Sequence, residues 1–558
     1  MKILLVGINA KFVHSNPAIY SLKAYAIKKS GDDERYKQNI DTLEISINME
    51  KGDVIREIYK KGADVVAFSC YLWNIAYVYS IISALHCITP DTAIWLGGPE
   101  VSFDPDNQLA KYSMIRGILC GEGEEIFYRL AKEYIENGSD KVLPRVLRAE
   151  RLDFNEVPFL YDNLSDFDNR IIYYESSRGC PFSCSYCLSS VDKFIRLRDI
   201  GIVLPELKRF LDAKVKQVKF VDRTFNCNPV HTKAILEFIR DKDNGITNFH
   251  FEMAADLITE EELQIMSSLR PGLIQIEVGI QTTNSDTLKA IKRKSNLDKI
   301  FENVRRILDK RNIHVHVDLI AGLPYEDITS FRQSFNDVYS LHANEFQLGF
   351  LKVLKGSLME QEADRYGIKY LAEPPYEVLM TNWLCFEDVT ELKAVEEMVE
   401  IYYNSAQFIN TMVFLEGYFD DAYSLYKSIA DYYALKGFDA IKLSRFDKYD
   451  ALRNFALSQL NDIDENKLTL VLLHDLYLRD NVKNRPPYAA VGEVDKSAYK
   501  NFFASGKYKE YLHNYEEYSS VQVSKMVHIE KCDGGYRLYD YRSKDPITQN
   551  AKCFPVEL

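Results

Sequence analysis

Short apolar stretches alternate with amphipathic stretches along residues 1–137. Segments 18–29 and 75–86 carry apolar residues at helical spacing. Alternation of strands and helices is typical of a parallel sheet covered by helices on both faces. We therefore predict an N-terminal α/β domain with a Rossmann-like, doubly wound parallel sheet. Its predicted strands lie at residues 2–7, 64–69, 93–97 and 117–119.

Glycine and small polar residues follow three of these strands. Ligands of parallel sheets bind at the carboxyl ends of the strands, and glycine there lets a large ligand approach the backbone closely. We therefore predict a ligand site along this edge of the sheet. Its candidate residues are Ser69, Tyr71, Gly97, Gly98, Gly121 and Glu122.

A second alternating region follows a polar, proline-containing connector. The connector spans residues 138–168 and the second region spans residues 169–358. Six strand–helix units predict a partial TIM barrel, with function at the carboxyl ends of the strands. The predicted strands are 170–175, 217–221, 250–254, 273–278, 314–320 and 345–351.

The remaining residues, 359–558, predict a mainly helical C-terminal domain that is rich in tyrosine. Segments 391–403 and 419–433 show helical apolar spacing, and 527–541 is β-like. Tyrosines in these helices either line a pocket or belong to a hydrophobic core, and core is the commoner role at such spacing. The sequence does not connect this domain to a particular reaction.

Charge and cysteine usage limit the partners and the compartment. The net charge is −13, from 69 Lys and Arg against 82 Asp and Glu, which argues against a nucleic-acid partner. The opening apolar run is too short for a secretory signal and predicts a strand, and no apolar run has the length of a membrane span. Ten cysteines without regular pairing suit a reducing compartment. We therefore expect a cytoplasmic protein without a membrane segment.

Three cysteines in one loop carry the most specific chemistry. Cys180, Cys184 and Cys187 have the spacing C-x3-C-x2-C. Clusters of the [4Fe–4S] kind are normally held by four thiolates, so three local ligands leave one iron open for chemistry. Zinc is the alternative, because C-x2-C is a zinc spacing, but it needs a fourth ligand, and the nearest later cysteine is Cys227.

The cysteine loop and the strand ends behind it resemble the radical S-adenosylmethionine (SAM) superfamily. The matching motifs are E-x-G-x-Q at 277–281 and D-L-I-x-G-L-P-x-E at 318–326. The resemblance implies that the three cysteines hold a catalytic [4Fe–4S] cluster whose open iron binds SAM. It implies contacts of SAM with Tyr186 at the adenine, with Asp222 or Asn226 at the amine, and with Glu252, Glu277 and Gln281 at the ribose. Asp222 and Asn226 stand where the family usually has Gly-Gly-Glu.

The N-terminal domain is similar to the cobalamin-binding domain that precedes this barrel in one large subgroup. Matching features are the Gly-Gly-Pro-Glu run at 97–100 and the Gly-Glu-Gly-Glu run at 121–124. The chain lacks the D-x-H-x-x-G motif that supplies an axial histidine, so the resemblance implies a cobalt without a protein histidine. The whole arrangement resembles cobalamin-binding radical SAM proteins with a helical C-terminal domain of unknown function.

The resemblance implies an enzyme that cleaves SAM reductively to a 5′-deoxyadenosyl radical and uses cobalamin to methylate an unactivated carbon. It implies a small-molecule or peptide substrate and a one-electron reductant such as flavodoxin or ferredoxin. Two alternatives stay open at this point. One is a cobalamin-independent radical SAM oxidase or RNA-modifying enzyme, and the other is a non-catalytic sensor of cluster and cobalamin.

Overall fold

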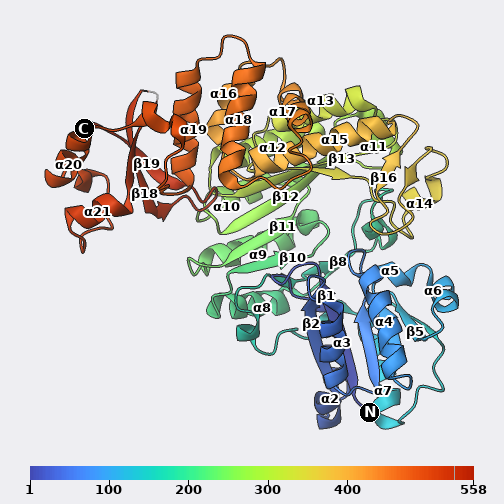
Figure 1. The fold of residues 1–558 in the computed structure, drawn as a ribbon. Helices are drawn as coiled ribbons and strands as arrows, with labels where there is room; N and C mark the ends of the chain where they lie inside the picture. The colour runs from blue at the N-terminus through green and yellow to red at the C-terminus, as the bar shows by residue number, and fades with distance from the viewer. Residues whose placement is uncertain (533) are drawn as a thin grey trace.

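The computed structural model describes residues 1–532 and 534–558. The N-terminal domain is a six-stranded sheet in the order β2-β1-β3-β4-β5-β6, and all its strands are parallel (Figure 1). Helices α1 and α7 cover one face, and α3 and α4 cover the other. The strands are β1 (Ile3–Asn9), β2 (Ile40–Ser46), β3 (Val65–Ser69), β4 (Ala93–Gly97), β5 (Ile115–Cys120) and β6 (Val146–Arg148).

Apolar runs buried on both faces build the centre of this sheet. Every residue of β1 and β3 is buried, as expected for a parallel sheet between two helical layers. The predicted fold class is confirmed. Strand β6 lies inside the segment predicted as a connector. The helices are α1 (Pro17–Lys29), α2 (Glu34–Asn39), α3 (Lys51–Lys60), α4 (Ile75–Ile88), α5 (Pro99–Ser102), α6 (Pro105–Lys111) and α7 (Gly123–Glu136).

The central domain is a second parallel six-stranded sheet, in the order β14-β13-β12-β11-β10-β7. Along β12 and β13 every second residue is buried against the helices, whereas the alternate residues are half-buried and mostly polar. The inner face of this partial barrel is therefore polar, unlike the packed interior of a complete TIM barrel. The strands are β7 (Ile172–Tyr174), β10 (Gln217–Phe220), β11 (Asn248–Glu252), β12 (Ile274–Gln281), β13 (His314–Ala321) and β14 (Glu345–Phe350). The helices are α8 (Ile200–Asp212), α9 (Pro229–Asp241), α10 (Glu260–Ser267), α11 (Ser285–Ala290), α12 (Leu297–Asp309) and α13 (Ile328–Tyr339).

The C-terminal region consists of helices followed by a small antiparallel sheet, β17-β18-β19. Most tyrosines of its larger helices belong to the core. Tyr402 and Tyr433, for example, are buried, and their hydroxyls lie 2.6 Å apart. His474 contacts the Tyr539 hydroxyl, and Asp475 accepts hydrogen bonds from the first backbone N–H groups of α16. The elements are α15 (Phe386–Val399), α16 (Ile409–Glu416), α17 (Ala422–Lys436), α18 (Arg445–Gln459), α19 (Glu465–Arg479), α20 (Lys496–Ala504), α21 (Ser520–Met526), β17 (His528–Cys532), β18 (Gly535–Lys544) and β19 (Ala551–Val556).

Residues 351–384 connect the barrel to the helical region and contact both the loop of the three cysteines and the N-terminal domain. The segment contains α14 (Leu358–Glu362), β15 (Lys369–Tyr370) and β16 (Val378–Met380). The backbone N–H of Met359 donates to Ser185 in the cysteine loop, at 2.8 Å. Lys355 and Tyr376 both contact Glu100 of the N-terminal domain. The segment therefore forms one wall of the region between the two sheets.

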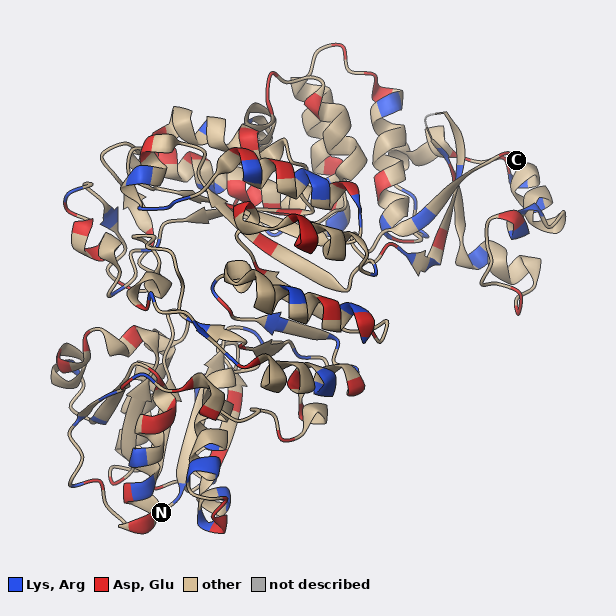
Figure 2. Ribbon diagram, turned by 180° about the vertical axis from the view of Figure 1, so that it is seen from behind, with Lys and Arg blue, Asp and Glu red and all other residues tan. Residues whose placement is uncertain are grey.

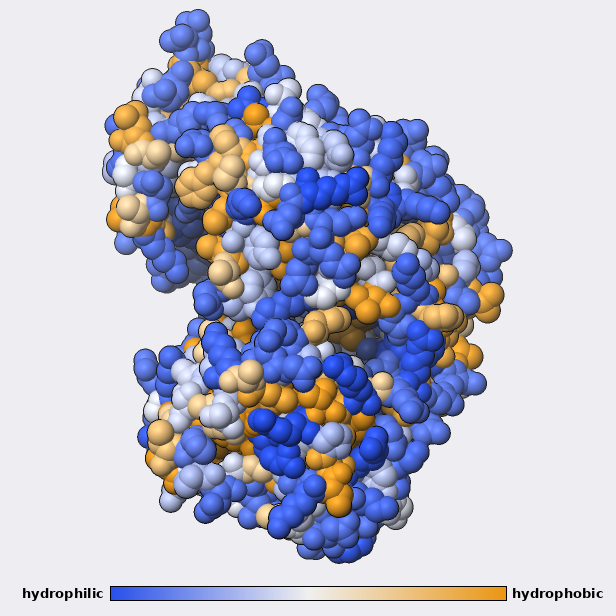
Figure 3. All heavy atoms as spheres, turned by 90° about the vertical axis from the view of Figure 1, so that its right-hand side faces the viewer, coloured by the Kyte–Doolittle hydropathy of each residue, from blue (hydrophilic) through white to orange (hydrophobic). Residues whose placement is uncertain are grey.

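The surface is indented where the N-terminal domain meets the rest of the molecule (Figure 3). Acidic and basic residues are interspersed along the helices of all regions (Figure 2). Among the residues described, we find no helix that combines the length and apolarity needed to cross a bilayer.

Candidate functional site

A short hairpin holds the three cysteines at the carboxyl end of β7. Strands β8 (Ser177–Arg178) and β9 (Arg196–Leu197) pair antiparallel and close the loop 179–195. Gly179 has φ +90°, and a Cβ there would lie 2.3 Å from the Phe194 carbonyl oxygen, so the hairpin requires glycine next to the first cysteine. Cys180 and Cys184 are buried, Cys187 is half-buried, and all three are free thiols.

The environment of these thiols fits an iron–sulfur cluster. Burial raises the pKa of Cys184, and the neighbouring Cys187 and Cys180 raise it further, whereas the Arg293 guanidinium acts in the opposite direction. Three thiols within electrostatic reach of one another on one loop are the donor set that a [4Fe–4S] cluster with one open iron needs. The Thr224 hydroxyl lies 3.6 Å from Cys180 Sγ.

Arg293 is a site residue that the sequence reasoning missed. It lies in the loop between α11 and α12, and its Nη1 donates to Cys184 Sγ at 3.6 Å and to the Tyr186 hydroxyl at 3.4 Å. Its Nη2 donates to the carbonyl of Gly279, and its buried Nε finds no hydrogen-bond partner in the part of the chain that the structure describes. A single arginine in an irregular loop carries no periodic signal, and only the fold brings it to the cysteine loop.

Glu252 and Glu277 lie side by side on the inner face of the barrel, at partner positions of β11 and β12. Burial alone would raise the pKa of Glu277, but the nearby His250 and Lys219 outweigh it and lower the pKa to about 2. Burial, together with the ionised Glu277, raises the pKa of Glu252 to about 7. One carboxylate is therefore fixed as an anion, and its neighbour can exchange a proton near neutral pH.

Gln281 offers an unsatisfied group where the sequence predicts a ribose contact. It has φ +74° and lies at an irregularity in the pairing of β12 with β13. Its Oε1 is buried and has no hydrogen-bond partner among the described residues. A strained backbone and an unpaired buried acceptor are unfavourable without a ligand, so this residue fits a SAM hydroxyl. The ribose contact itself stays a prediction.

Asp222 and Asn226 are fully buried and bonded within the protein. The Asp222 carboxylate accepts hydrogen bonds from the Ser176 N–H and from the hydroxyls of Ser176 and Ser177, at 2.9, 2.7 and 2.6 Å. Asn226 exchanges two 2.9 Å hydrogen bonds with the backbone of Ala254. Both residues fix strand ends around the site, and their contact with the SAM amine stays a prediction. Tyr186 packs in the apolar cluster around Leu351 and Val378.

The carboxyl edge of the N-terminal sheet brings the predicted cobalamin residues together with an unpredicted aromatic. Tyr71 stacks on Trp73 with ring centroids 4.4 Å apart, and Trp73 is 49% exposed. Gly98 has φ +111°, and a Cβ there would lie 2.4 Å from the Cys70 carbonyl oxygen. Ser69 and Gly97 are the last residues of β3 and β4, and Gly121 directly follows the neighbouring strand β5. A flat, partly exposed aromatic surface beside close-packed glycines fits a large planar cofactor.

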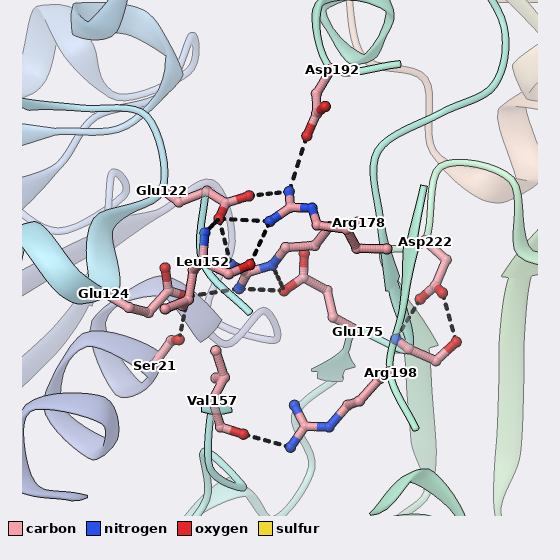
Figure 4. A network of polar contacts seen from close by, with 12 residues as sticks. Ser21, Glu122, Glu124, Leu152, Val157, Glu175, Arg178, Asp192, Arg198 and Asp222 are labelled. Atoms are coloured by element: carbon pink, nitrogen blue, oxygen red, sulfur yellow. Dashed lines mark hydrogen bonds and ion pairs between the residues drawn. The ribbon is translucent and has the colours of Figure 1, made fainter. Parts of the chain in front are cut away.

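Two residues of this edge make contacts that the sequence did not predict. Glu122 points toward the arginines of the cysteine hairpin (Figure 4). His14 contacts the Tyr173 hydroxyl through Nδ1 at 2.7 Å, and its backbone bridges to Ile171 beside β7. The loop after β1 therefore attaches the N-terminal domain to the first strand of the barrel.

Three family models match successive regions of the chain. Residues 3–131 match the B12 binding domain, residues 174–338 match the radical SAM superfamily, and residues 364–550 match a protein family of unknown function, DUF4080. These matches support the cluster over zinc, and they confirm the predicted cofactors: a [4Fe–4S] cluster, SAM and cobalamin.

Curated relatives match at low identity. The cobalamin-dependent radical SAM methyltransferase TokK of Streptomyces tokunonensis is 25% identical over 425 residues, which is 66% of this chain and 58% of TokK. The 2-(S-pantetheinyl)-carbapenam-3-carboxylate methyltransferase of Streptantibioticus cattleyicolor is 26% identical, over 56% of this chain and 51% of that protein. The chain thus spans little more than half the length of these curated relatives.

Solved structures share the fold. The radical SAM methyltransferase TsrM from Kitasatospora setae, solved with cobalamin and a [4Fe–4S] cluster, aligns with a TM-score of 0.54 and 18% identity, over 67% of this chain and 79% of TsrM. The cobalamin-dependent SAM radical enzyme OxsB, solved with aqua-cobalamin and SAM, aligns with a TM-score of 0.54 and 15% identity, over 85% of this chain and 78% of OxsB.

Proposed function

Because this chain belongs to the radical SAM superfamily and carries an N-terminal B12-binding domain, we propose that it is a cobalamin-dependent methyltransferase that acts on an unactivated carbon. The observation that supports this most directly is the position of the three free thiols. They lie in one loop at the carboxyl end of β7, and the hairpin that carries them contacts the carboxyl edge of the N-terminal sheet. Two cofactors bound at these edges face the same space.

Each group of residues has a role in this proposal. When bound, the cluster and SAM supply a 5′-deoxyadenosyl radical and cobalamin supplies the methyl group. Cys180, Cys184 and Cys187 hold the cluster, and Arg293 offsets its negative charge. Gln281 and Glu252 orient the ribose of SAM. The apolar residues of segment 351–384 that pack on Tyr186 exclude water from the radical.

We infer that the substrate is a small molecule or a peptide, and that the cluster receives its electron from a one-electron donor such as a flavodoxin or ferredoxin. The cysteines must stay reduced to hold iron, which suits the cytoplasm. The substrate itself enters from the indented region between the two sheets.

The test of radical chemistry uses protein purified without oxygen and reconstituted with iron and sulfide. With SAM and a reductant, we expect 5′-deoxyadenosine by liquid chromatography. Cys184→Ala should lose both the product and the brown absorbance, whereas the exposed Cys87→Ala should keep both. A loaded wild type that forms no 5′-deoxyadenosine would favour the sensor alternative.

The test of the second cofactor adds hydroxocobalamin before gel filtration. We expect about one cobalt per chain and a retained corrin absorbance, and Gly98→Ala should lose both. A protein that retains neither cobalt nor corrin absorbance but still produces 5′-deoxyadenosine would favour the cobalamin-independent oxidase or RNA-modifying enzyme.

A further inference from the structure

Acidic side chains of the N-terminal domain reach the base of the cysteine hairpin (Figure 4). Glu122 and Glu124 both belong to the Gly-Glu-Gly-Glu run: Glu122 directly precedes α7, and Glu124 lies in its first turn. Glu122 forms an ion pair with Arg196, and Glu124 Oε1 lies 2.7 Å from Arg178 Nη2. These contacts connect residues that are 74 and 54 positions apart in the sequence.

The two arginines are the pair that closes the hairpin. Arg178 and Arg196 are partners in the β8–β9 ladder, and Arg178 stands two positions before Cys180. Further contacts fix both guanidinium groups. Arg178 Nη2 lies 2.8 Å from Glu175, and Arg196 lies 3.0 Å from both Asp192 and the carbonyl oxygen of Leu152. The geometry of the hairpin thus depends on both domains.

The centre of this network is largely excluded from water. The side chain of Arg178 is 13% exposed and that of Glu124 is 5% exposed. Glu124 also accepts a 2.8 Å hydrogen bond from Ser21 of α1, which fixes it within the N-terminal domain. A buried charge is costly without its partner. Loss of Arg178 would remove the ion-pair partner of the buried Glu124, whereas loss of Glu124 would leave Arg178 with Glu175 as its nearest carboxylate.

We propose that Glu122, Glu124, Arg178 and Arg196 form a clamp by which the N-terminal domain positions the cysteine loop. The clamp sets how firmly the cluster is held and how its open iron is presented to the facing sheet. It is a positioning device, because none of its side chains contacts a cysteine sulfur in the described residues. This inference rests on the cluster of the proposed function, and it does not depend on methyl transfer.

The test compares Glu124→Gln, Glu122→Gln and Arg178→Lys in the full-length, cluster-loaded protein. Outer-shell substitutions weaken metal sites by about 10- to 100-fold, so we expect Glu124→Gln to release iron to bathophenanthroline roughly tenfold faster. Arg178→Lys keeps the positive charge but loses the planar guanidinium that can bind two carboxylate oxygens at once. Its rate of iron release should therefore lie between the rates of the wild type and Glu124→Gln. The control is Arg306→Gln, which removes an exposed ion pair with Glu260 on the outside of the barrel.

A spectroscopic measurement separates positioning from general stability. We expect the electron paramagnetic resonance signal of the reduced, SAM-bound cluster to shift in Glu124→Gln and Glu122→Gln, and to stay unchanged in Arg306→Gln. If Glu124→Gln does not fold, the more exposed Glu122→Gln carries the test. Wild-type iron release and signal in a loaded clamp variant would overturn the clamp alone, whereas a wild type that binds no cluster would overturn the proposed function as well.

Discussion

Arg293 is the residue through which the protein should set the reduction potential of the cluster. We predict that Arg293→Gln lowers the midpoint potential, because the substitution removes a positive charge whose Nη1 lies 3.6 Å from Cys184 Sγ. The reduced cluster carries one more negative charge than the oxidised cluster, so the positive charge of Arg293 stabilises the reduced cluster more.

The structure sets the size of the effect. Two unit charges at this separation interact by about 4.6 kcal/mol at an effective dielectric constant of about 20. Because a one-electron couple changes by about 59 mV for a tenfold change in equilibrium, this corresponds to roughly 200 mV. Water that enters beside the glutamine amide replaces part of the lost electrostatic stabilisation, so we expect the midpoint potential to decrease by about 50–150 mV.

The assay is a redox titration of the reconstituted protein, followed by electron paramagnetic resonance. Lys294→Gln is the matched control, because it removes the same charge from an exposed side chain one residue farther along the loop. Arg293→Lys should fall between wild type and Arg293→Gln. An Arg293→Gln potential equal to that of Lys294→Gln would refute the reasoning.

Two further predictions concern the folding of the two sheets. The pKa of Glu252 is raised to about 7, so this group stabilises the fold at low pH and loses that contribution, up to about 3 kcal/mol, as pH rises from about 4.5 through 7. In urea unfolding, the stability of Glu252→Gln should therefore depend less on pH in this window than the stability of the wild type. An unchanged pH dependence would argue against the shifted pKa. Gly98→Ala should lower the melting temperature by several degrees, because the added Cβ would overlap the Cys70 backbone. The control is Gly52→Ala, whose Cβ meets no described atom within 4 Å and should not lower the melting temperature. Equal melting temperatures for Gly98→Ala and the wild type would contradict the close packing.

Local patterns in the sequence were sufficient to predict most strands and helices of both sheet domains. Buried parallel strands are continuous apolar runs, so β1, β3 and β4 were visible directly. Strand β2 was missed because its half-buried sequence mixes polar and apolar residues, and the three-residue β6 was too short to stand out. Most tyrosines of the larger C-terminal helices lie in the core, which is the commoner of the two roles considered.

The sequence by itself determined the candidate ligand set of the cysteine loop, because local chain geometry brings together three cysteines that lie within eight residues. Only the tertiary structure decided what surrounds that loop. Arg293 reaches Cys184 across 109 positions, and Glu122 reaches Arg196 across 74. Such partners depend on how two sheets pack against one hairpin, and a single sequence records no spacing for them. The physical reason is that residues close in sequence stay close in any fold, so a local spacing is enough to identify a ligand set. The charged residues that surround this set come from distant parts of the chain, and only folding buries them beside it.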